Sequence, residues 1–93
     1  MTIGIIAWEL EVFGCQSLKE KRSVIKSLKD RLHNQFNVSV AETAHQDTWQ
    51  RAELTACVVA GEKRVAESVL ASADRLVMAE PRARVIDTYR SFR

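Results

Sequence analysis

The sequence predicts an α+β domain in which four strands and two helices follow the order βαββαβ. Three stretches alternate apolar and polar residues, as strands with one buried face do, and a fourth is rich in β-forming residues. Two further stretches place apolar residues at intervals of three and four, as helices do. Only three glycines and one proline punctuate the 93 residues, without a repeat or a linker, so we expect one domain over residues 1–93. The predicted strands are 2–13, 37–44, 51–60 and 82–92.

The first strand and the start of the first helix carry the clearest local signals. Alternate positions of the strand are apolar, with Trp8 among them and glutamates between. After a short connection, the run from Ser17 to Glu20 has the spacing of a capping box, in which the serine hydroxyl accepts a free backbone N–H and the glutamate reaches back. A helix of about 18 residues is therefore expected to begin there. Its apolar stripe consists of Leu18, Ile25, Leu28, Leu32 and Phe36.

The second half of the chain repeats this alternation of strand and helix. In the third strand Leu54, Ala56 and Val58 share one parity, which predicts a buried face. A second helix is expected over 62–79, and Pro81 ends it because proline cannot donate a helical hydrogen bond. The expected inner stripe of this helix is Val65, Val69, Leu76 and Val77. The last strand has apolar residues on both parities, so its facing stays open.

The element order is that of the ferredoxin-like plan, an antiparallel sheet with both helices on one face, which is an α/β sandwich. Right-handed crossovers favour the strand order 4-1-3-2. The first two strands then run in the same direction, so their carboxyl ends lie at one end of the sheet. The segments 14–22 and 45–49 and the turn at Pro81 should meet there.

The net charge of +2 is unevenly distributed along the chain. Between positions 19 and 31 six cations oppose two acids, so this segment carries +4 and the remainder −2. Three of these cations fall in the first turns of the helix, where they oppose its dipole. The helix therefore presents a basic face, which either binds an anion such as the RNA backbone or is an ordinary solvated surface. The face consists of Lys19, Arg22, Lys26, Lys29 and His33.

A second group of polar residues lies between His45 and Arg51. One histidine with isolated carboxylates is not a convincing metal or catalytic set, so we predict no catalytic residue, metal or cofactor. Instead, His45 hydrogen-bonds the backbone, or Gln46, Gln50 and Arg51 extend the basic edge. Trp49 either packs the end of the sheet or stacks on a base. Lys21 points towards the apolar stripe and is expected to direct its ammonium outward. The candidate anion- or RNA-binding residues are Ser17, Lys19, Lys21, Arg22, Lys26, Lys29, His45, Gln46 and Arg51.

The sheet face without helices suggests another function class. Its first strand would show Ile3, Ile5 and Ala7, a partly apolar surface that a monomer rarely leaves exposed. The alternative to RNA binding is therefore a homo-oligomeric structural or protein-interaction module, with a dimer favoured.

The first residues bear on localisation. They have no basic leader and are apolar only up to Glu9, and no run approaches the ~18 apolar residues of a membrane span. We therefore expect a cytoplasmic protein without a membrane partner, in which Cys15 and Cys57 are reduced thiols.

Three segments together resemble the YlxP-like family, a bacterial domain of unknown function. They are SLKEKRS at 17–23, NVSVAE at 37–42 and HQDTWQR at 45–51. The resemblance implies a compact ferredoxin-like fold in a bacterial cytoplasmic protein. Members are often encoded beside genes for translation initiation and ribosome maturation, which implies an RNA or ribosomal partner but supplies no catalytic residue.

Overall fold

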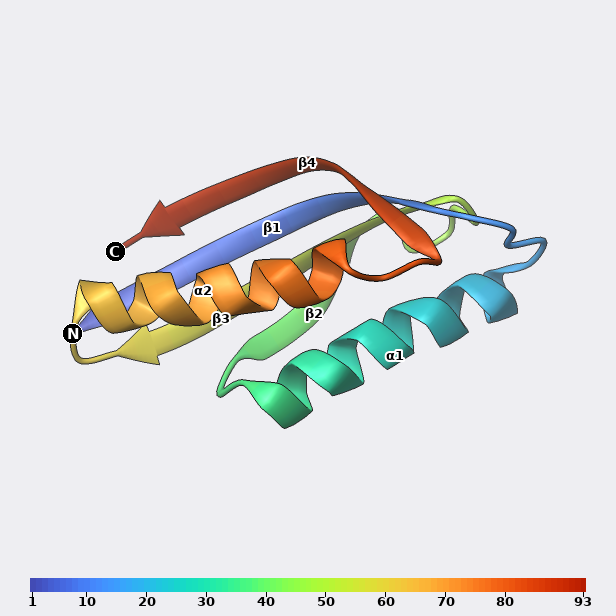
Figure 1. The fold of residues 1–93 in the computed structure, drawn as a ribbon. Helices are drawn as coiled ribbons and strands as arrows, with labels where there is room; N and C mark the ends of the chain where they lie inside the picture. The colour runs from blue at the N-terminus through green and yellow to red at the C-terminus, as the bar shows by residue number, and fades with distance from the viewer.

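The computed structural model describes residues 1–93 and has the predicted element order (Figure 1). The predicted strands and the second helix extend one or two residues too far at some ends, and only the third strand keeps its predicted limits. No helix is long and apolar enough to cross a membrane. The elements are β1 (Thr2–Val12), α1 (Leu18–Gln35), β2 (Ser39–Ala44), β3 (Arg51–Ala60), α2 (Lys63–Met78) and β4 (Ala83–Phe92).

The four strands form one antiparallel sheet in the order β2-β3-β1-β4, which is the predicted order read from the other edge. Both helices cover the same face, and the opposite face carries none (Figure 1). α2 packs mainly on β1 and β3, while α1 packs on β2. The ferredoxin-like α+β prediction is therefore confirmed.

The core lies between the sheet and the two helices. On β1 the predicted inner residues Ile6, Trp8, Leu10 and Val12 are all buried. The indole N–H of Trp8 donates to Asp74 on α2 at 2.9 Å, which satisfies the one polar group of the ring. The bond also links β1 to α2, so the buried ring is attached to the helix that covers it.

The capping box at the start of α1 is present in a slightly shifted form. The Ser17 hydroxyl accepts the backbone N–H of Glu20 at 3.1 Å. The Glu20 carboxylate accepts from the N–H of Gln16 at 2.8 Å, one residue before the cap itself. Two otherwise free donors are satisfied, so the helix starts where the sequence predicts.

The predicted inner stripe of α2 is right only in part: Val77 is buried and Val69 and Leu76 pack against the core, but Val65 does not. Val65 is 46% exposed, whereas the buried residues are Ala66, Leu70, Ala73 and Val77. The alanines face inward because the helix lies close to β1 at Gly4, where an added Cβ would lie 3.0 Å from Leu70 Cδ1. A search for large apolar residues misses this stripe, because the close approach of α2 to β1 requires small residues such as alanine at the contact.

A β-bulge explains why both parities of β4 are apolar. Glu9 of β1 pairs with Asp87 and the next residue, Leu10, pairs with Val85. Ile86 is therefore the extra residue of the bulge and is 44% exposed. The inward parity changes at this point, so no single alternation runs through the strand.

Candidate nucleic-acid interface

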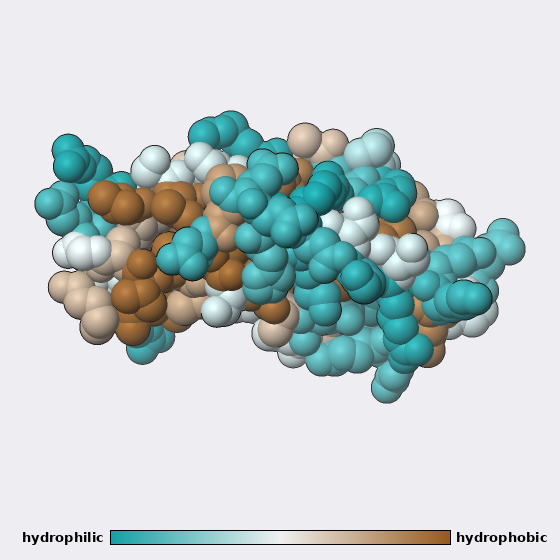
Figure 2. Space-filling view, turned by 90° about the horizontal axis from the view of Figure 1, so that it is seen from below, coloured by the Kyte–Doolittle hydropathy of each residue, from teal (hydrophilic) through white to brown (hydrophobic).

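The predicted basic face of α1, formed by Lys19, Arg22, Lys26, Lys29 and His33, borders a groove between this helix and the edge strand β2. α1 runs along the sheet and β2 returns beside it, so the helix forms one wall and β2 the other. The groove has a volume of about 400 Å³. Hydrophilic side chains cover the half of the molecule that contains α1 in Figure 2. The groove is lined by Arg22, Ile25, Lys26, Lys29, Asp30, His33, Val40 and Glu42.

Most cations of the protein are committed to a carboxylate partner, but those of the α1 basic face are largely free. Nine of the fourteen lysines and arginines form an ion pair within 4 Å. Three of the remaining five lie on this single helix face. The five unpaired residues are Lys19, Arg22, Lys29, Arg75 and Arg93.

Lys26 is the member of this face that has a partner. Its ammonium donates to Asp30 one turn later at 2.7 Å, and both side chains are more than half exposed. The hydrogen bond from Lys26 is the largest cause that lowers the pKa of Asp30. Such an exposed pair contributes little energy, so Asp30 holds Lys26 only weakly.

The expectation that Lys21 directs its ammonium outward is wrong. The side chain is 0% exposed, and its ammonium donates to Glu42 on β2 at 2.5 Å and to the carbonyl of His45 at 2.7 Å. Lys21 lies on the buried side of α1, so its side chain is enclosed between the helix and the sheet and does not reach solvent. Lys21 joins α1, β2 and the following segment, and its charge is balanced within the protein.

The segment 45–51 lies beside α1, but two of its predicted contributors turn to the other side of the sheet. His45 Nε2 lies 2.8 Å from Glu9 Oε1, and Arg51 donates to the same oxygen at 2.7 Å. Glu9 lies on the face of the sheet that carries no helix, which we call the open face. Neither side chain therefore joins the α1 basic face. Gln46 stays on the groove side, where its amide donates to the carbonyl of Glu42 at 3.2 Å. The predicted meeting of the ends of β1 and β2 is confirmed.

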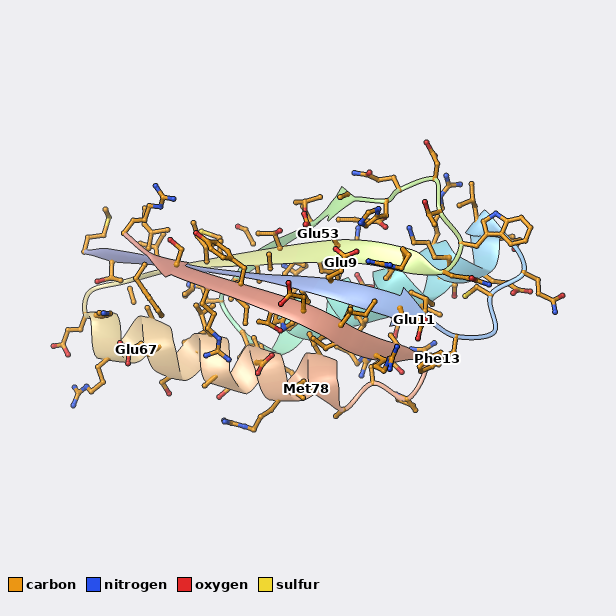
Figure 3. The ribbon with its side chains drawn as sticks, turned by 90° about the horizontal axis from the view of Figure 1, so that it is seen from above. Glu9, Glu11, Phe13, Glu53, Glu67 and Met78 are labelled. Carbon is orange, nitrogen blue, oxygen red and sulfur yellow. The ribbon has the colours of Figure 1, made fainter.

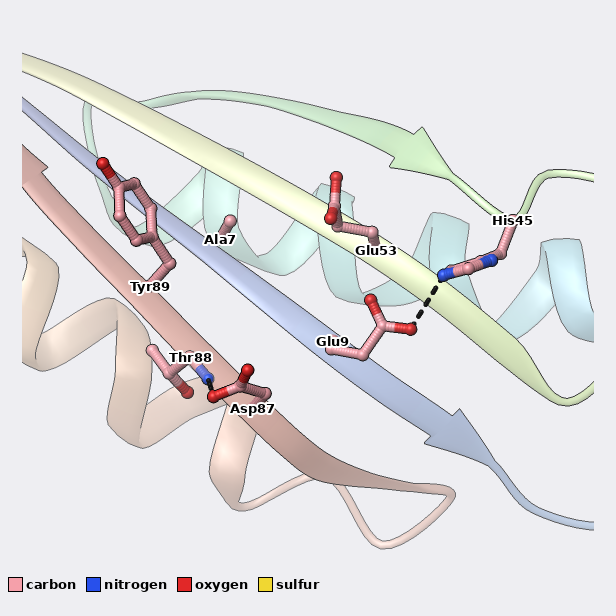
Figure 4. Close-up of a pocket in the computed structure, with 7 residues that line it drawn as sticks. All are labelled: Ala7, Glu9, His45, Glu53, Asp87, Thr88 and Tyr89. Atoms are coloured by element: carbon pink, nitrogen blue, oxygen red, sulfur yellow. Dashed lines mark hydrogen bonds and ion pairs between the residues drawn. The ribbon is translucent and has the colours of Figure 1, made fainter.

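The open face carries a row of acids where these side chains gather. Glu9 is directly opposite Glu53 on β3 and Asp87 on β4. Glu9 and Glu53 lie beside each other in Figure 3, and Figure 4 shows His45 reaching over the strand to Glu9. No group of three or more His, Cys, Asp or Glu has an arrangement that holds a metal ion. The hollow, of about 340 Å³, is lined by Ala7, Glu9, His45, Glu53, Asp87, Thr88 and Tyr89.

Two aromatic rings lie exposed at the end of the molecule where α1 begins. Trp49 and Phe13 are each 48% exposed. Trp49 is therefore not one of the core residues. Phe13 was not among the predicted site residues, although one signal was available: it follows Glu9 and Glu11 on the outward parity of β1. The backbone N–H of Val12 donates to the carbonyl of Gln50 at 2.9 Å, so the two aromatic segments are neighbours.

Two further titratable groups have structural roles: Cys15, which precedes α1, and Glu80, which lies beside Arg31 of that helix. Glu80 is buried and accepts hydrogen bonds from Arg82 and Arg31, and those from Arg82 are the largest cause that lowers its pKa to about 2. Burial raises the pKa of the Cys15 thiol, which is therefore a poor nucleophile at neutral pH.

Sequence comparisons place this fold beside known proteins. The DUF503 family profile, described as a protein of unknown function, matches residues 3–90. The uncharacterized protein YlxP of Bacillus subtilis (strain 168) is 40% identical over 68 residues, which cover 73% of this chain and 74% of that protein.

Structural comparisons show the same fold at low identity. A de novo designed ferredoxin-fold protein, LFR1 1, matches with a TM-score of 0.50 and 17% identity over 100% of this chain and 85% of its own. SnoaB, a cofactor-independent oxygenase from Streptomyces nogalater, matches with a TM-score of 0.52 and 11% identity over 99% of this chain and 90% of its own. At such identities the likeness concerns the fold alone.

Proposed function

The chain belongs to the DUF503 family of proteins of unknown function, and we propose that it is a non-enzymatic cytoplasmic protein that binds RNA, alone or in a ribosomal particle, through the α1 basic face. The observation that carries the proposal is the set of unpaired cations. Lys19, Arg22 and Lys29 have no carboxylate partner, although the protein pairs nine of its other cations. An anionic polymer supplies the missing counter-charge.

The geometry of the face suits a polyanion rather than a single small ion. At 1.5 Å per residue the row from Lys19 to His33 extends about 20 Å, which is enough to reach several phosphates. Neighbouring members are three or four residues apart, so they project from one side of the helix. The groove beside them is open to solvent along β2, and therefore a chain can lie in it without displacing core residues.

The test compares two variants of equal charge. The first replaces Lys19, Arg22 and Lys29 by glutamine, and the control replaces Arg64, Arg75 and Arg93 by glutamine, which lie on α2 and at the carboxyl end. Both lose three positive charges, but only the first loses the α1 basic face. Binding to ribosomal RNA fragments and to 30S particles is measured by fluorescence anisotropy and co-sedimentation at several salt concentrations.

We expect the first variant to lose most of its affinity and the control to keep it. The slope of log affinity against log salt should become shallower by about 2 in the first variant, because each phosphate contact to a single strand contributes about 0.7. Equal losses in both variants would mean that net charge, and not this face, determines binding. Absence of binding by the unmodified protein at low salt would overturn the proposed function.

A second candidate is self-association through the open sheet face, favoured by a different observation. Val59 is 60% exposed and Tyr89 61% exposed, and they share this face with partly exposed Ile3, Ile5 and Cys57. Ile3, Ile5, Cys57 and Val59 occupy the half of the face away from the acidic row, and Tyr89 borders that row. A second copy of the chain is therefore the matching occupant. Val59→Lys should shift sedimentation to a monomer, whereas Met78→Lys, at an equally exposed apolar position outside this face, should not. A monomer at tens of micromolar for the unmodified chain would exclude this candidate.

A further inference from the structure

The groove beside α1 ends at Arg22 and Glu42, next to the segment that follows β2 and carries Trp49. Lys21 holds both Glu42, near the end of β2, and the carbonyl of His45, so the chain leaving β2 stays against the first turns of α1. Gln46 donates back to the carbonyl of Glu42, which keeps the start of this segment beside the groove. An elongated ligand in the groove therefore reaches the 45–50 segment when it passes Arg22.

Trp49 is exposed at this point although tryptophan is costly to leave in water. The residue is 48% exposed, and no hydrogen bond of its indole holds it on the surface. Phe13, equally exposed, lies on the neighbouring segment but on the outward parity of β1. Proteins bind single strands by combining cations along the backbone with aromatic rings stacked on bases, and here an exposed ring lies on a segment that is held against the first turns of the cationic helix.

We propose that the ligand of this groove is a single-stranded nucleic acid, with its phosphates along the α1 basic face and one base stacked on Trp49. This proposal rests on the proposed function and adds the strandedness and the stacking residue. A duplex has its bases paired and stacked internally, so it offers phosphates to the face but no free base to Trp49. The site should therefore discriminate between the two forms.

The protein contains a built-in fluorescent probe for this contact. It has two tryptophans, and Trp8 is 0% exposed with its N–H bonded to Asp74. A base stacked on Trp49 should quench the emission of Trp49 and leave the emission of the buried Trp8 unchanged. Trp49→Phe removes the signal but keeps an aromatic ring, while Trp49→Leu removes both.

The experiment titrates the full chain with a 12-nucleotide oligouridine, the same length of duplex RNA and the matching single-stranded DNA. We expect the oligouridine to quench Trp49 fluorescence and to bind more tightly than the duplex. Trp49→Leu should weaken single-strand binding by about 5- to 150-fold, the range for loss of one stacked base. Trp49→Phe should retain most of that affinity, and duplex binding should be equal in all three proteins.

The outcomes separate this proposal from the proposed function. If the α1 glutamine variant loses binding while Trp49→Leu binds oligouridine normally, the stacking proposal is overturned and RNA binding by the face stands. Tighter binding of the duplex would also overturn it. If neither nucleic acid binds the unmodified chain, both proposals fail. Equal binding of single-stranded RNA and DNA supports the stacking proposal, and shows that the 2′-hydroxyl is not recognised.

Discussion

The individual residue that most changes the interpretation of the sequence is Lys21. It lies within a run of basic residues, so composition assigns it to the same surface as its neighbours. Its position in the helical repeat decides otherwise, because it shares the phase of Ile25 and Leu28 and is enclosed with them. A buried ammonium needs a charged partner, and here the partner is Glu42 on β2. The sequence alone does not show that Lys21 and Glu42 meet.

Replacement of Lys21 by methionine should destabilise the protein, because Glu42 is left without its partner at a nearly enclosed position. We expect the free energy of unfolding to fall by about 3 kcal/mol, measured by urea denaturation. The control Lys26→Met breaks an exposed pair with Asp30 and should cost under about 0.5 kcal/mol. Equal effects of the two changes would mean that the enclosed pair contributes no more than a surface pair.

Glu80 predicts how stability depends on acid. Its pKa is about 2 in the folded chain against 4.5 as the ordinary value, so the folded state favours the charged form. This contribution is complete above pH 4.5 and is lost as pH falls towards 2. Glu80→Gln should destabilise by about 2 kcal/mol at pH 7, and the difference from the unmodified protein should shrink between pH 4.5 and 2. A difference that is constant over that range would contradict the assignment.

At the scale of elements, the sequence predicts the order and the sheet topology because these depend on periodicity, caps and handedness, all of which are local or general. It predicts only part of the inner face of α2, and it leaves the facing of β4 open. Both depend on contacts between distant segments: the close approach of α2 to Gly4, and the bulge at which Asp87 and Val85 meet successive residues of β1. For the same reason the sequence places His45 and Arg51 near α1 but not on the correct side of the sheet.

The close approach of α2 to β1 leaves no space for a side chain at Gly4. A Cβ there would lie 3.0 Å from Leu70 and 3.2 Å from Val58, which are both core residues. Gly4→Val should therefore lower the free energy of unfolding by about 1–3 kcal/mol, as overpacked cores do. Gly61→Val is the control, because nothing lies within 4 Å of a Cβ at that position. A thermal melting temperature unchanged by Gly4→Val would show that α2 can shift away without cost.

At the scale of the whole molecule, the modest net charge of +2 separates into two surfaces of opposite character. Unpaired cations border the groove at the edge formed by α1 and β2. Acids line up on the open face, where Glu53, Glu9 and Asp87 are opposite one another. A polyanion is attracted to the first surface and repelled from the second, so the proposed RNA binding and the proposed self-association use separate surfaces.

Cys57 reports which of these two surfaces is covered, because it pairs with Ile5 on the open face and is partly exposed. Cys15 is buried, so its slow maleimide labelling is an internal reference within the same chain. Raising the protein concentration should slow the labelling of Cys57 if copies associate through the open face. Oligouridine should leave that rate unchanged in dilute protein, because the α1 basic face lies on the other side of the sheet. If RNA slows the labelling of Cys57 in monomeric protein, as measured by mass spectrometry, it binds the open face and the assignment of the groove is wrong.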